Sequence, residues 1–161
     1  MAFLPRDFDV PATLETERFR MRSITIHDVI KDYDAVMSSR EHLWELFGEA
    51  WGWPPADLTL EANLAELGWH QIEFQHKSSF DYAVMSPDEG RLLGCVYVDP
   101  PTVAGYDAEV FYWARPTEPG LEDELGRTVR AWIDERWPFE RVAYPGRDVA
   151  WQSWLEQPRL S

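Results

Sequence analysis

DAEVFYWARPTEPGLEDELGRTVRAWIDERW, residues 107–137, is the stretch that decides the fold of this chain. Its segment AEVFYWA is almost wholly apolar on both faces of an extended chain, which is typical of a strand in the middle of a sheet. A turn with proline and glycine follows, and LGRTVRAWIDERW then repeats apolar residues at helical spacing. The stretch therefore predicts a buried strand over Ala108–Arg115, a tight connection and an amphipathic helix that reaches Trp137.

Glu109 is the charged residue within the segment AEVFYWA, and it shares a face with Phe111 and Trp113. Asp107 and Gly105 precede it closely, which favours a solvated position at the end of the strand. In a cleft, by contrast, burial would raise its pKa and make it the best general-base candidate in the chain. The sequence leaves both positions open.

Length and composition place the chain among globular proteins and limit its partners. With 161 residues it is long enough for a real core, and we expect a single domain over 1–161. The chain is acidic, with a formal net charge of −14. This disfavours nucleic acid and anionic membranes as partners, because both bind basic surfaces. The same balance permits a cationic substrate such as an amine.

The chain is rich in tryptophan, with nine residues of this type. We expect most of the rings to fill the core, because they fall at positions that a helix or strand would bury. Two functional interpretations stand beside this one: an aromatic-lined pocket for a flat or hydrophobic ligand, and an exposed aromatic patch. The patch would be built from Trp51, Trp53, Trp69, Trp151 and Trp154.

Cysteine and histidine usage argues against a disulfide framework and a metal site. The single cysteine, Cys95, lies in the apolar run LLGCVYV and is expected to be buried and inert. His70 and His76 fall on different faces of a predicted helix, so we expect solvent-facing or capping histidines. Neither a signal peptide nor a long apolar span is visible, which predicts a cytoplasmic protein.

Along the chain, periodicity and turn signals predict an α/β architecture, a mixed sheet with helices on its faces. Residues 14–24 alternate as a half-exposed strand, and Thr25 with Asp28 forms a capping box that opens a helix. Ser38 repeats that start signal, and Thr59 precedes a third helix. The remaining elements are a hairpin over 79–86 and 91–100, a strand over 141–144 and a short helix over 149–157.

The segment LETERFRMRSITIHD, residues 14–28, resembles the opening of GNAT-type N-acyltransferases, in particular the branch that acetylates the N-termini of ribosomal proteins. The hairpin with RLLGCVYVD, the strand AEVFYWARP and the helix after it match this family in order and spacing. The resemblance implies a mostly antiparallel twisted sheet in which the strands Ala108–Arg115 and Arg141–Tyr144 splay apart. It also implies transfer of an acyl group from acyl-CoA to an amine.

Candidate site residues follow from the same resemblance. Acyl-CoA, with acetyl-CoA as the expected cofactor, would lie in the splay, where the backbone of Trp113 and Ala114 would bond the pantetheine arm. Arg115 and Gly120 are further candidates for contact with the cofactor. Glu109 would act as the base, directly or through water. The family's tyrosine protonates the departing thiolate; the nearest hydroxyl alternatives to it are Tyr144, the candidate for this role, and Ser153.

Three features depart from the family pattern. The family's pyrophosphate loop is basic and glycine-rich, whereas here Gly120 keeps the first glycine position, Pro119 replaces the usual arginine and Glu122 replaces the second glycine. The carboxylates of residues 122–124 complete the helix dipole themselves and would repel a pyrophosphate. Leu155 takes the place of the family's tyrosine, and the sequence predicts no strand pair after the last helix.

Two functions are therefore weighed. The first is an acyl-CoA-dependent N-acyltransferase that acts on an amine, either a small molecule or a protein N-terminus. The second is a catalytically inactive GNAT-like domain that does not bind acyl-CoA and binds a ligand or protein partner through the same cleft. The acceptor wall that the absent strand pair usually builds is expected from the WGWPP segment, residues 51–55, or from a partner subunit in a homodimer.

Overall fold

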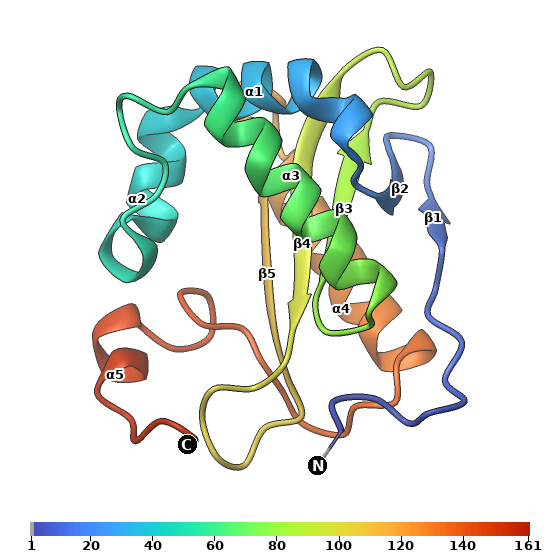
Figure 1. Ribbon diagram of the computed structural model, residues 1–161, viewed down its shortest axis with the longest axis vertical. Helices are drawn as coiled ribbons and strands as arrows, with labels where there is room; N and C mark the ends of the chain where they lie inside the picture. Colours follow the sequence, from blue (N-terminus) through green and yellow to red (C-terminus); the bar gives the residue numbers. More distant parts are fainter. Residues whose placement is uncertain (1) are drawn as a thin grey trace.

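An open six-stranded sheet runs through the middle of the structure, with its strands in the order β1-β2-β3-β4-β5-β6 (Figure 1). The computed structural model describes residues 2–161. Neighbouring strands are antiparallel from β1 to β5, and β6 pairs parallel with β5. The strands are β1 Thr13–Glu15, β2 Arg20–Ser23, β3 Phe80–Met85, β4 Leu92–Asp99, β5 Ala108–Ala114 and β6 Val142–Ala143.

Helices cover both faces of this sheet. Those between β2 and β3 lie on one face, and α4 lies on the other, so that α3 crosses in front of β3 and β4 while α4 runs behind them (Figure 1). No helix within residues 2–161 combines the length and apolar character needed to cross a membrane. The helices are α1 Val29–Ser38, α2 Arg40–Trp51, α3 Leu60–Gln75, α4 Leu121–Arg136 and α5 Trp151–Leu155, with a short 3-10 turn at Ile26–Asp28.

The strand β5 is buried along its whole length, as the apolar character of both its faces predicts. On one face Tyr112 packs in the core that α4 covers, and on the other Phe111 and Trp113 pack in the core under α1 to α3. Gly94 of β4 lies against this strand so closely that a Cβ there would stand 2.0 Å from the carbonyl oxygen of Trp113. The central strand pair therefore requires glycine at this position.

The predicted helix starts are largely confirmed. Thr25 and Asp28 form the capping box, and the Thr59 hydroxyl accepts a hydrogen bond from the backbone of Ala62. The prediction for Ser38 is wrong, because its hydroxyl bonds Ala35 and Arg115 instead of capping α2. Ser38 ends α1, and only one residue separates it from α2. That residue, Ser39, occupies the N-cap position of α2, and its side chain makes no cap hydrogen bond.

The single strand predicted over residues 14–24 is in fact two strands, β1 and β2. Between them the backbone turns, and the Thr16 hydroxyl accepts hydrogen bonds from the backbone of Arg18 and Phe19. A threonine that bonds the chain two and three residues on offers the backbone an alternative to the extended ladder. The polar run Thr16–Arg18 thus forms a turn, and the alternation resumes in β2.

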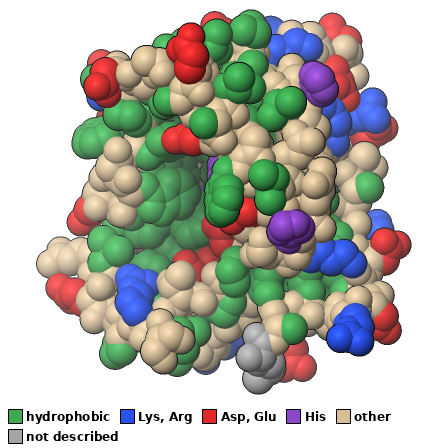
Figure 2. Space-filling view, viewed as in Figure 1, with side chains coloured by type: hydrophobic (Ala, Val, Ile, Leu, Met, Phe, Trp, Pro, Cys, Tyr) green, Lys and Arg blue, Asp and Glu red, His purple; other side chains and the backbone are tan. Residues whose placement is uncertain are grey.

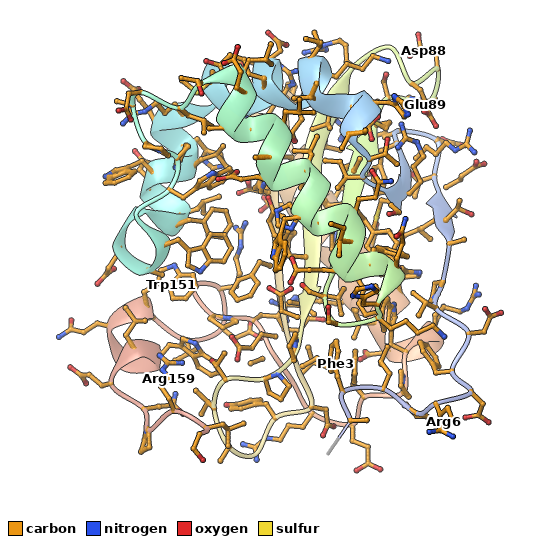
Figure 3. The ribbon with its side chains drawn as sticks, in the orientation of Figure 1. Phe3, Arg6, Asp88, Glu89, Trp151 and Arg159 are labelled. Carbon is orange, nitrogen blue, oxygen red and sulfur yellow. The ribbon has the colours of Figure 1, made fainter. Side chains whose placement is uncertain are left out.

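The predicted hairpin over 79–86 and 91–100 is confirmed as β3 and β4. Its turn is held by Ser86 and Asp88, and Glu89 reaches back to Arg22 of β2 (Figure 3). Within residues 2–161, β6 is the last strand of the sheet and is shorter than the predicted strand over 141–144. The mixed, mostly antiparallel sheet with helices on both faces agrees with the predicted fold class.

Candidate functional site

A cavity of about 780 Å³ lies between α3, the end of α2 and the face of β3 and β4 that these helices cover. Figure 2 shows it as a hollow with hydrophobic walls and acidic side chains at its margin. The register of the sheet brings its floor together, because Asp81 pairs with Tyr97 and Asp99 pairs with Glu109. Residues from distant parts of the sequence therefore meet in one concave site.

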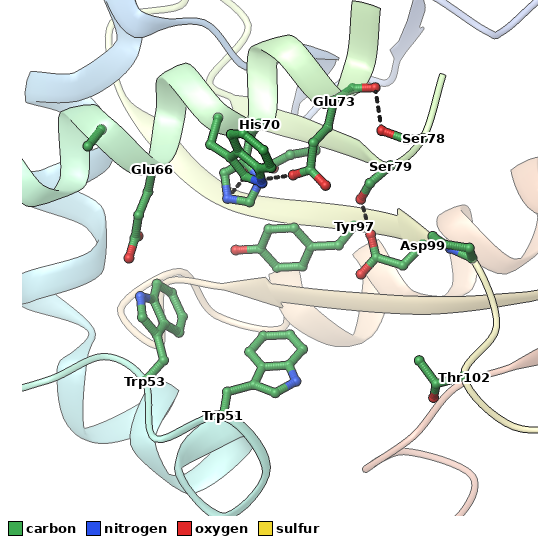
Figure 4. Close-up of a pocket in the computed structure, with 14 residues that line it drawn as sticks. Trp51, Trp53, Glu66, His70, Glu73, Ser78, Ser79, Tyr97, Asp99 and Thr102 are labelled. Atoms are coloured by element: carbon green, nitrogen blue, oxygen red, sulfur yellow. Dashed lines mark hydrogen bonds and ion pairs between the residues drawn. The ribbon is translucent and has the colours of Figure 1, made fainter. Parts of the chain in front are cut away.

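One part of the cavity is aromatic. Trp51 stacks on Phe47 with 4.2 Å between ring centroids, and its edge contacts Phe111 at 4.9 Å and Tyr97 at 6.0 Å. Trp53 lies beside it, with 6.5 Å between the two ring centroids (Figure 4). Trp51 and Trp53 belong to the WGWPP segment, which was expected to build the acceptor wall.

The other part of the cavity is acidic and surrounds a histidine. His70 projects from α3, with its Nδ1 atom 3.5 Å from Glu73 and its Nε2 atom 3.6 Å from Asp81 (Figure 4). Asp99, at the end of β4, accepts a hydrogen bond from the Ser79 hydroxyl. Glu66 lines the cavity one helical turn before His70. An excess of carboxylates over cations makes this end of the cavity electronegative.

Asp81 is the least satisfied of these carboxylates. Its side chain is 5% exposed, and within residues 2–161 its Oδ1 atom has no hydrogen-bond partner. Burial raises its pKa well above the usual range, and the neighbouring carboxylates Asp32 and Asp99 raise it further. Burial likewise raises the pKa of Asp99 to about 6. Both groups would gain free energy from a cation bound in the cavity.

Glu109 lies beside this cavity rather than open within it. Its side chain is buried, and its carboxylate accepts hydrogen bonds from the backbone N–H and the hydroxyl of Thr102, which itself lines the cavity. Tyr144 is buried in the core on the α4 side, with the Arg130 guanidinium 3.9 Å from its ring centroid. Burial raises the pKa of Tyr144. The structure thus puts these two candidates on opposite sides of the sheet.

The strands β5 and β6 pair only at Ala108 and Glu109, and the edge of β5 beyond that pairing faces a network of charged side chains; this place is called the groove between β5 and β6. In an extended strand the carbonyl of one residue and the N–H two residues later face the same edge. Here the Ala114 N–H donates to Glu122 Oε1 at 3.0 Å, and the Tyr112 carbonyl accepts from Arg147 at 2.6 Å. Arg147 also bonds Glu122 at 3.2 Å, and His42 lies 2.7 Å from the same carboxylate.

This network gives the Glu122 carboxylate three different partners. Burial alone would raise its pKa, but the hydrogen bonds from His42 and Ala114 and the charge of Arg147 together hold the pKa below its usual range. The hydrogen bond between His42 and Glu122 also raises the pKa of His42. Nearby, Trp151 stacks on Phe111 with 6.0 Å between centroids. Protein side chains therefore occupy the groove where β5 and β6 diverge.

Arg115 points away from this groove, and Gly120 stands at the start of α4, where the Arg18 guanidinium bonds the Pro119 carbonyl at 3.1 Å. Arg115 is buried and points to α1, where it bonds the Leu92 carbonyl, Ser38 and Asp34. Gly120 precedes α4 in a left-handed conformation with φ of 68°, and no side chain caps the helix.

The residues present do not fit acetyl-CoA in this arrangement. Of the two residues whose backbone was expected to bond the pantetheine arm, Ala114 already donates its N–H to Glu122, and Trp113 pairs with Cys95 of β4. The neighbouring Tyr112 carbonyl is bonded to Arg147. The first turn of α4, where a pyrophosphate would need donors and positive charge, carries Glu122, Asp123 and Glu124. Two arginines near that turn are paired with its carboxylates, Arg18 with Glu124 at 3.3 Å and Arg147 with Glu122 at 3.2 Å.

His70, Asp81 and Asp99 were not predicted from the sequence as site residues. His70 was expected to face solvent or cap a helix, and the two aspartates lie in a hairpin that reads as structural. A signal was present, because Asp81 interrupts an otherwise apolar strand FDYAVM that is buried throughout. A carboxylate at such a position is either paired or functional. Of the tryptophan patch, Trp51 and Trp69 are exposed and line the cavity, while Trp154 is buried.

Comparison with known proteins places this geometry in a structural class. A scan against protein-family models and a search of curated proteins gave no match for this sequence. Among solved structures, the chain is similar to the ribosomal-protein-S5-alanine acetyltransferase from Vibrio fischeri, with 21% identity and a TM-score of 0.64, covering 87% of this chain and 76% of that one.

Two further solved structures are similar in the same way. The ribosomal L7/L12 alpha-N-protein acetyltransferase RimL has 12% identity and a TM-score of 0.56, covering 83% of this chain and 71% of its own. The microcin C7 self-immunity acetyltransferase MccE, solved with acetyl-CoA and AMP, has 10% identity and a TM-score of 0.58, covering 78% of this chain and 68% of its own. The chain therefore has the fold of the GNAT acetyltransferases.

Proposed function

We propose that this protein is a GNAT-fold domain that binds a cationic amine in the cavity between α3 and β4 and does not use acyl-CoA. The hydrogen bond from the Ala114 N–H to Glu122 carries this proposal. A pantetheine amide would need that donor, and the Tyr112 carbonyl beside it, to pair with β5 as a strand does. The chain's own Glu122 and Arg147 make the same two bonds.

Electrostatics supports the same conclusion. An acyl-CoA would bring its pyrophosphate to a helix start that carries three carboxylates of its own. Each close pair of like charges near the surface costs on the order of 1 kcal/mol or more. Glu122 and Glu124 are paired with Arg147 and Arg18, so the repulsion that remains is about that of one carboxylate. It is enough to cancel the roughly 0.3–1 kcal/mol that the helix end offers an anion.

The cavity, by contrast, has the chemistry of an amine site. Its carboxylates attract a protonated amine, and its rings supply apolar surface and cation–π contact. Its volume of about 780 Å³ lies within the range of small-molecule sites. An anionic ligand would meet Glu66, Glu73, Asp81 and Asp99 with no lysine or arginine among the lining residues.

Calorimetric titration of the full chain tests the two parts of the proposal together. We expect no heat of binding from acetyl-CoA at about 1 mM, and a measurable heat from amines that fit the cavity. Acetyl-CoA that bound with micromolar affinity and raised the melting temperature would overturn the exclusion of the cofactor. Free CoA is the matched control, since it shares the pyrophosphate and pantetheine but lacks the acyl group.

Acyl transfer to an amine is the second candidate, favoured by the fold that the chain shares with acetyltransferases. Fold alone does not carry function, so this candidate needs its own test. It requires Glu122 and Arg147 to leave the edge of β5. Glu122→Ala frees the Ala114 N–H, and acetyl-CoA binding to that variant but not to the natural chain would identify the network as the remaining obstacle.

A further inference from the structure

The cavity is chemically two-ended, and this arrangement narrows the ligand beyond the proposed function. Figure 4 shows Trp51 and Trp53 together on one side, with Ser79 and Asp99 on another and His70 between them. Asp81 lies in the floor, on the strand next to Tyr97. A ligand that fills the space therefore needs an apolar part and a charged part in one molecule.

The polar end offers an acceptor that the protein leaves unused. Asp81 Oδ1 is buried and has no hydrogen-bond partner within residues 2–161, and Oδ2 stands 3.6 Å from His70, longer than a hydrogen bond. A buried acceptor without a partner costs roughly 1–3 kcal/mol, and more when it is charged. An ammonium group would supply both the missing donor and the missing charge.

The apolar end is rigid and already shaped. Trp51 is fixed between the stacked ring of Phe47 and the edge of Phe111. The hydroxyl of Tyr97 accepts a hydrogen bond of 2.9 Å from Trp113, which fixes that ring too. Trp69 keeps 62% of its surface exposed although it lines the cavity. Rings held in this way contact a ligand without a large loss of side-chain entropy.

The cavity is a poor site for an extended peptide. Peptide binding beside a sheet uses the hydrogen-bonding groups of a free strand edge. Here β4 is paired on both sides by β3 and β5, and β3 is paired with β4 and, over Tyr82–Met85, with β2. At Asp81 the carbonyl is bonded to the N–H of Ile24. The strands that form the floor therefore have no free edge for the backbone amides of a peptide.

We propose that the cavity binds an amphipathic monoamine, whose protonated nitrogen reaches Asp81 and whose flat apolar body lies against Trp51, Trp53 and Trp69. This inference rests on the proposed function, because it names the class of amine for the same site. The ligand is recognised by two features in one molecule, a positive charge and a flat apolar ring.

Tryptamine is a suitable probe for calorimetry with the full chain. We expect it to bind at least about ten-fold more tightly than propylamine, which has the charge without the ring. Indole-3-propionate, which has the ring with the opposite charge, is expected not to bind. Equal binding of all three would show that the cavity selects neither charge nor ring and would overturn the inference, as would tighter binding of trialanine amide than of tryptamine.

Variants locate the ligand. Asp81→Asn and Trp69→Ala are each expected to weaken tryptamine binding by about ten-fold. Trp69 is largely exposed, so its variant keeps the fold even where a change at Asp81 disturbs it. Trp44→Ala and Glu61→Gln are matched controls, since both residues lie on α2 or α3 outside the cavity. Control variants that lost as much affinity as the cavity variants would place the binding site elsewhere.

Addition of acetyl-CoA separates this inference from the proposed function. Tryptamine that binds and is then acetylated would uphold the ligand class and overturn the exclusion of acyl-CoA. If neither tryptamine nor acetyl-CoA binds, the proposed ligand class is overturned, and the exclusion of acyl-CoA still holds. Binding of tryptamine without acetylation is the result expected when both are correct.

Discussion

The cavity under α3 and the groove between β5 and β6 each contain a carboxylate at their centre, but the two carboxylates have opposite surroundings. Glu122 has donors from the backbone of Ala114, from His42 and from Arg147. Asp81 has an oxygen with no partner within residues 2–161 and a histidine just beyond hydrogen-bond distance. A satisfied carboxylate fixes structure, whereas an unsatisfied one in a cavity is available to a ligand.

The two carboxylates also differ in what the surrounding fold leaves open to a ligand. The fold provides a splayed strand pair, which in this chain is occupied by its own side chains. The free acceptor lies on the other side of β5, in the space under α3. The comparison therefore predicts that changes at the two carboxylates will act on stability with opposite signs.

The largest effect is expected from Glu122→Gln. The substitution keeps the shape but removes the charge that pairs with Arg147 and His42, and we expect it to lower the free energy of unfolding by about 2–3 kcal/mol. Urea unfolding near pH 6 measures this loss. Asp123→Asn is the control in the same helical turn, and it should cost no more than about 1 kcal/mol. Equal losses of unfolding free energy for the two variants would show that the network around Glu122 does not stabilise the fold.

Asp81→Asn is expected to act in the opposite direction. The raised pKa of Asp81 means that the folded state pays for ionising it, so its contribution to stability is present at low pH and is lost as pH rises through the folded pKa. The amide removes that loss, and we expect a gain of about 1 kcal/mol near neutral pH. The gain should be larger at pH 8 than at pH 5. A destabilised variant at both pH values would contradict the view of Asp81 as an unsatisfied group.

The affinity for an amine is expected to rise with pH between about 5 and 7. Burial raises the pKa of Asp99 to about 6 and also raises that of Glu66, so both become fully anionic only as pH increases. The amine stays protonated throughout, and His70, Asp81 and Glu73 are the other carboxyl and imidazole groups that face it. We expect roughly a five- to ten-fold gain for tryptamine, measured by calorimetry in a constant ionic strength.

Asp99→Asn provides the control for this pH effect. The variant should lose much of the rise in affinity, because the carboxylate that titrates near 6 is gone. Glu61→Gln, which neutralises a carboxylate on α3 outside the cavity, should leave the rise in affinity with pH unchanged. An affinity that fell with increasing pH in the natural chain would show that these carboxylates do not hold the amine.

The sequence predicted what depends on local pattern. The all-apolar strand β5, the hairpin around residues 87–90 and the caps at Thr25 and Thr59 each follow from neighbouring residues. The turn at Thr16 was missed, because a side-chain hydrogen bond to the backbone competes with an alternation that continues on both sides. Local signals of this kind decide most of the fold.

The site depended on contacts that local pattern does not encode. His70, Asp81 and Asp99 come from three elements and meet only through the register of β3 and β4 with α3 above them. The network in the groove likewise joins α2, α4 and the turn after β6 through Glu122. Its acidic helix start was recognised from sequence as unsuited to a pyrophosphate, but the partners that hold it were not. Long-range pairing of charges follows from the tertiary structure alone.

The smallest predicted effect concerns His42, the third member of the network at Glu122. The hydrogen bond to Glu122 raises the pKa of His42 above 6.5, so its stabilising contribution is complete below that value and is lost as pH rises through the folded pKa. We expect His42→Gln to cost about 0.5–1 kcal/mol near pH 6 and less near pH 8.5, measured by urea unfolding. His76→Gln, at the exposed end of α3, should cost little at either pH. A loss for His42→Gln that did not shrink with pH would show that Glu122 is held by Arg147 and Ala114 without help from the histidine's charge.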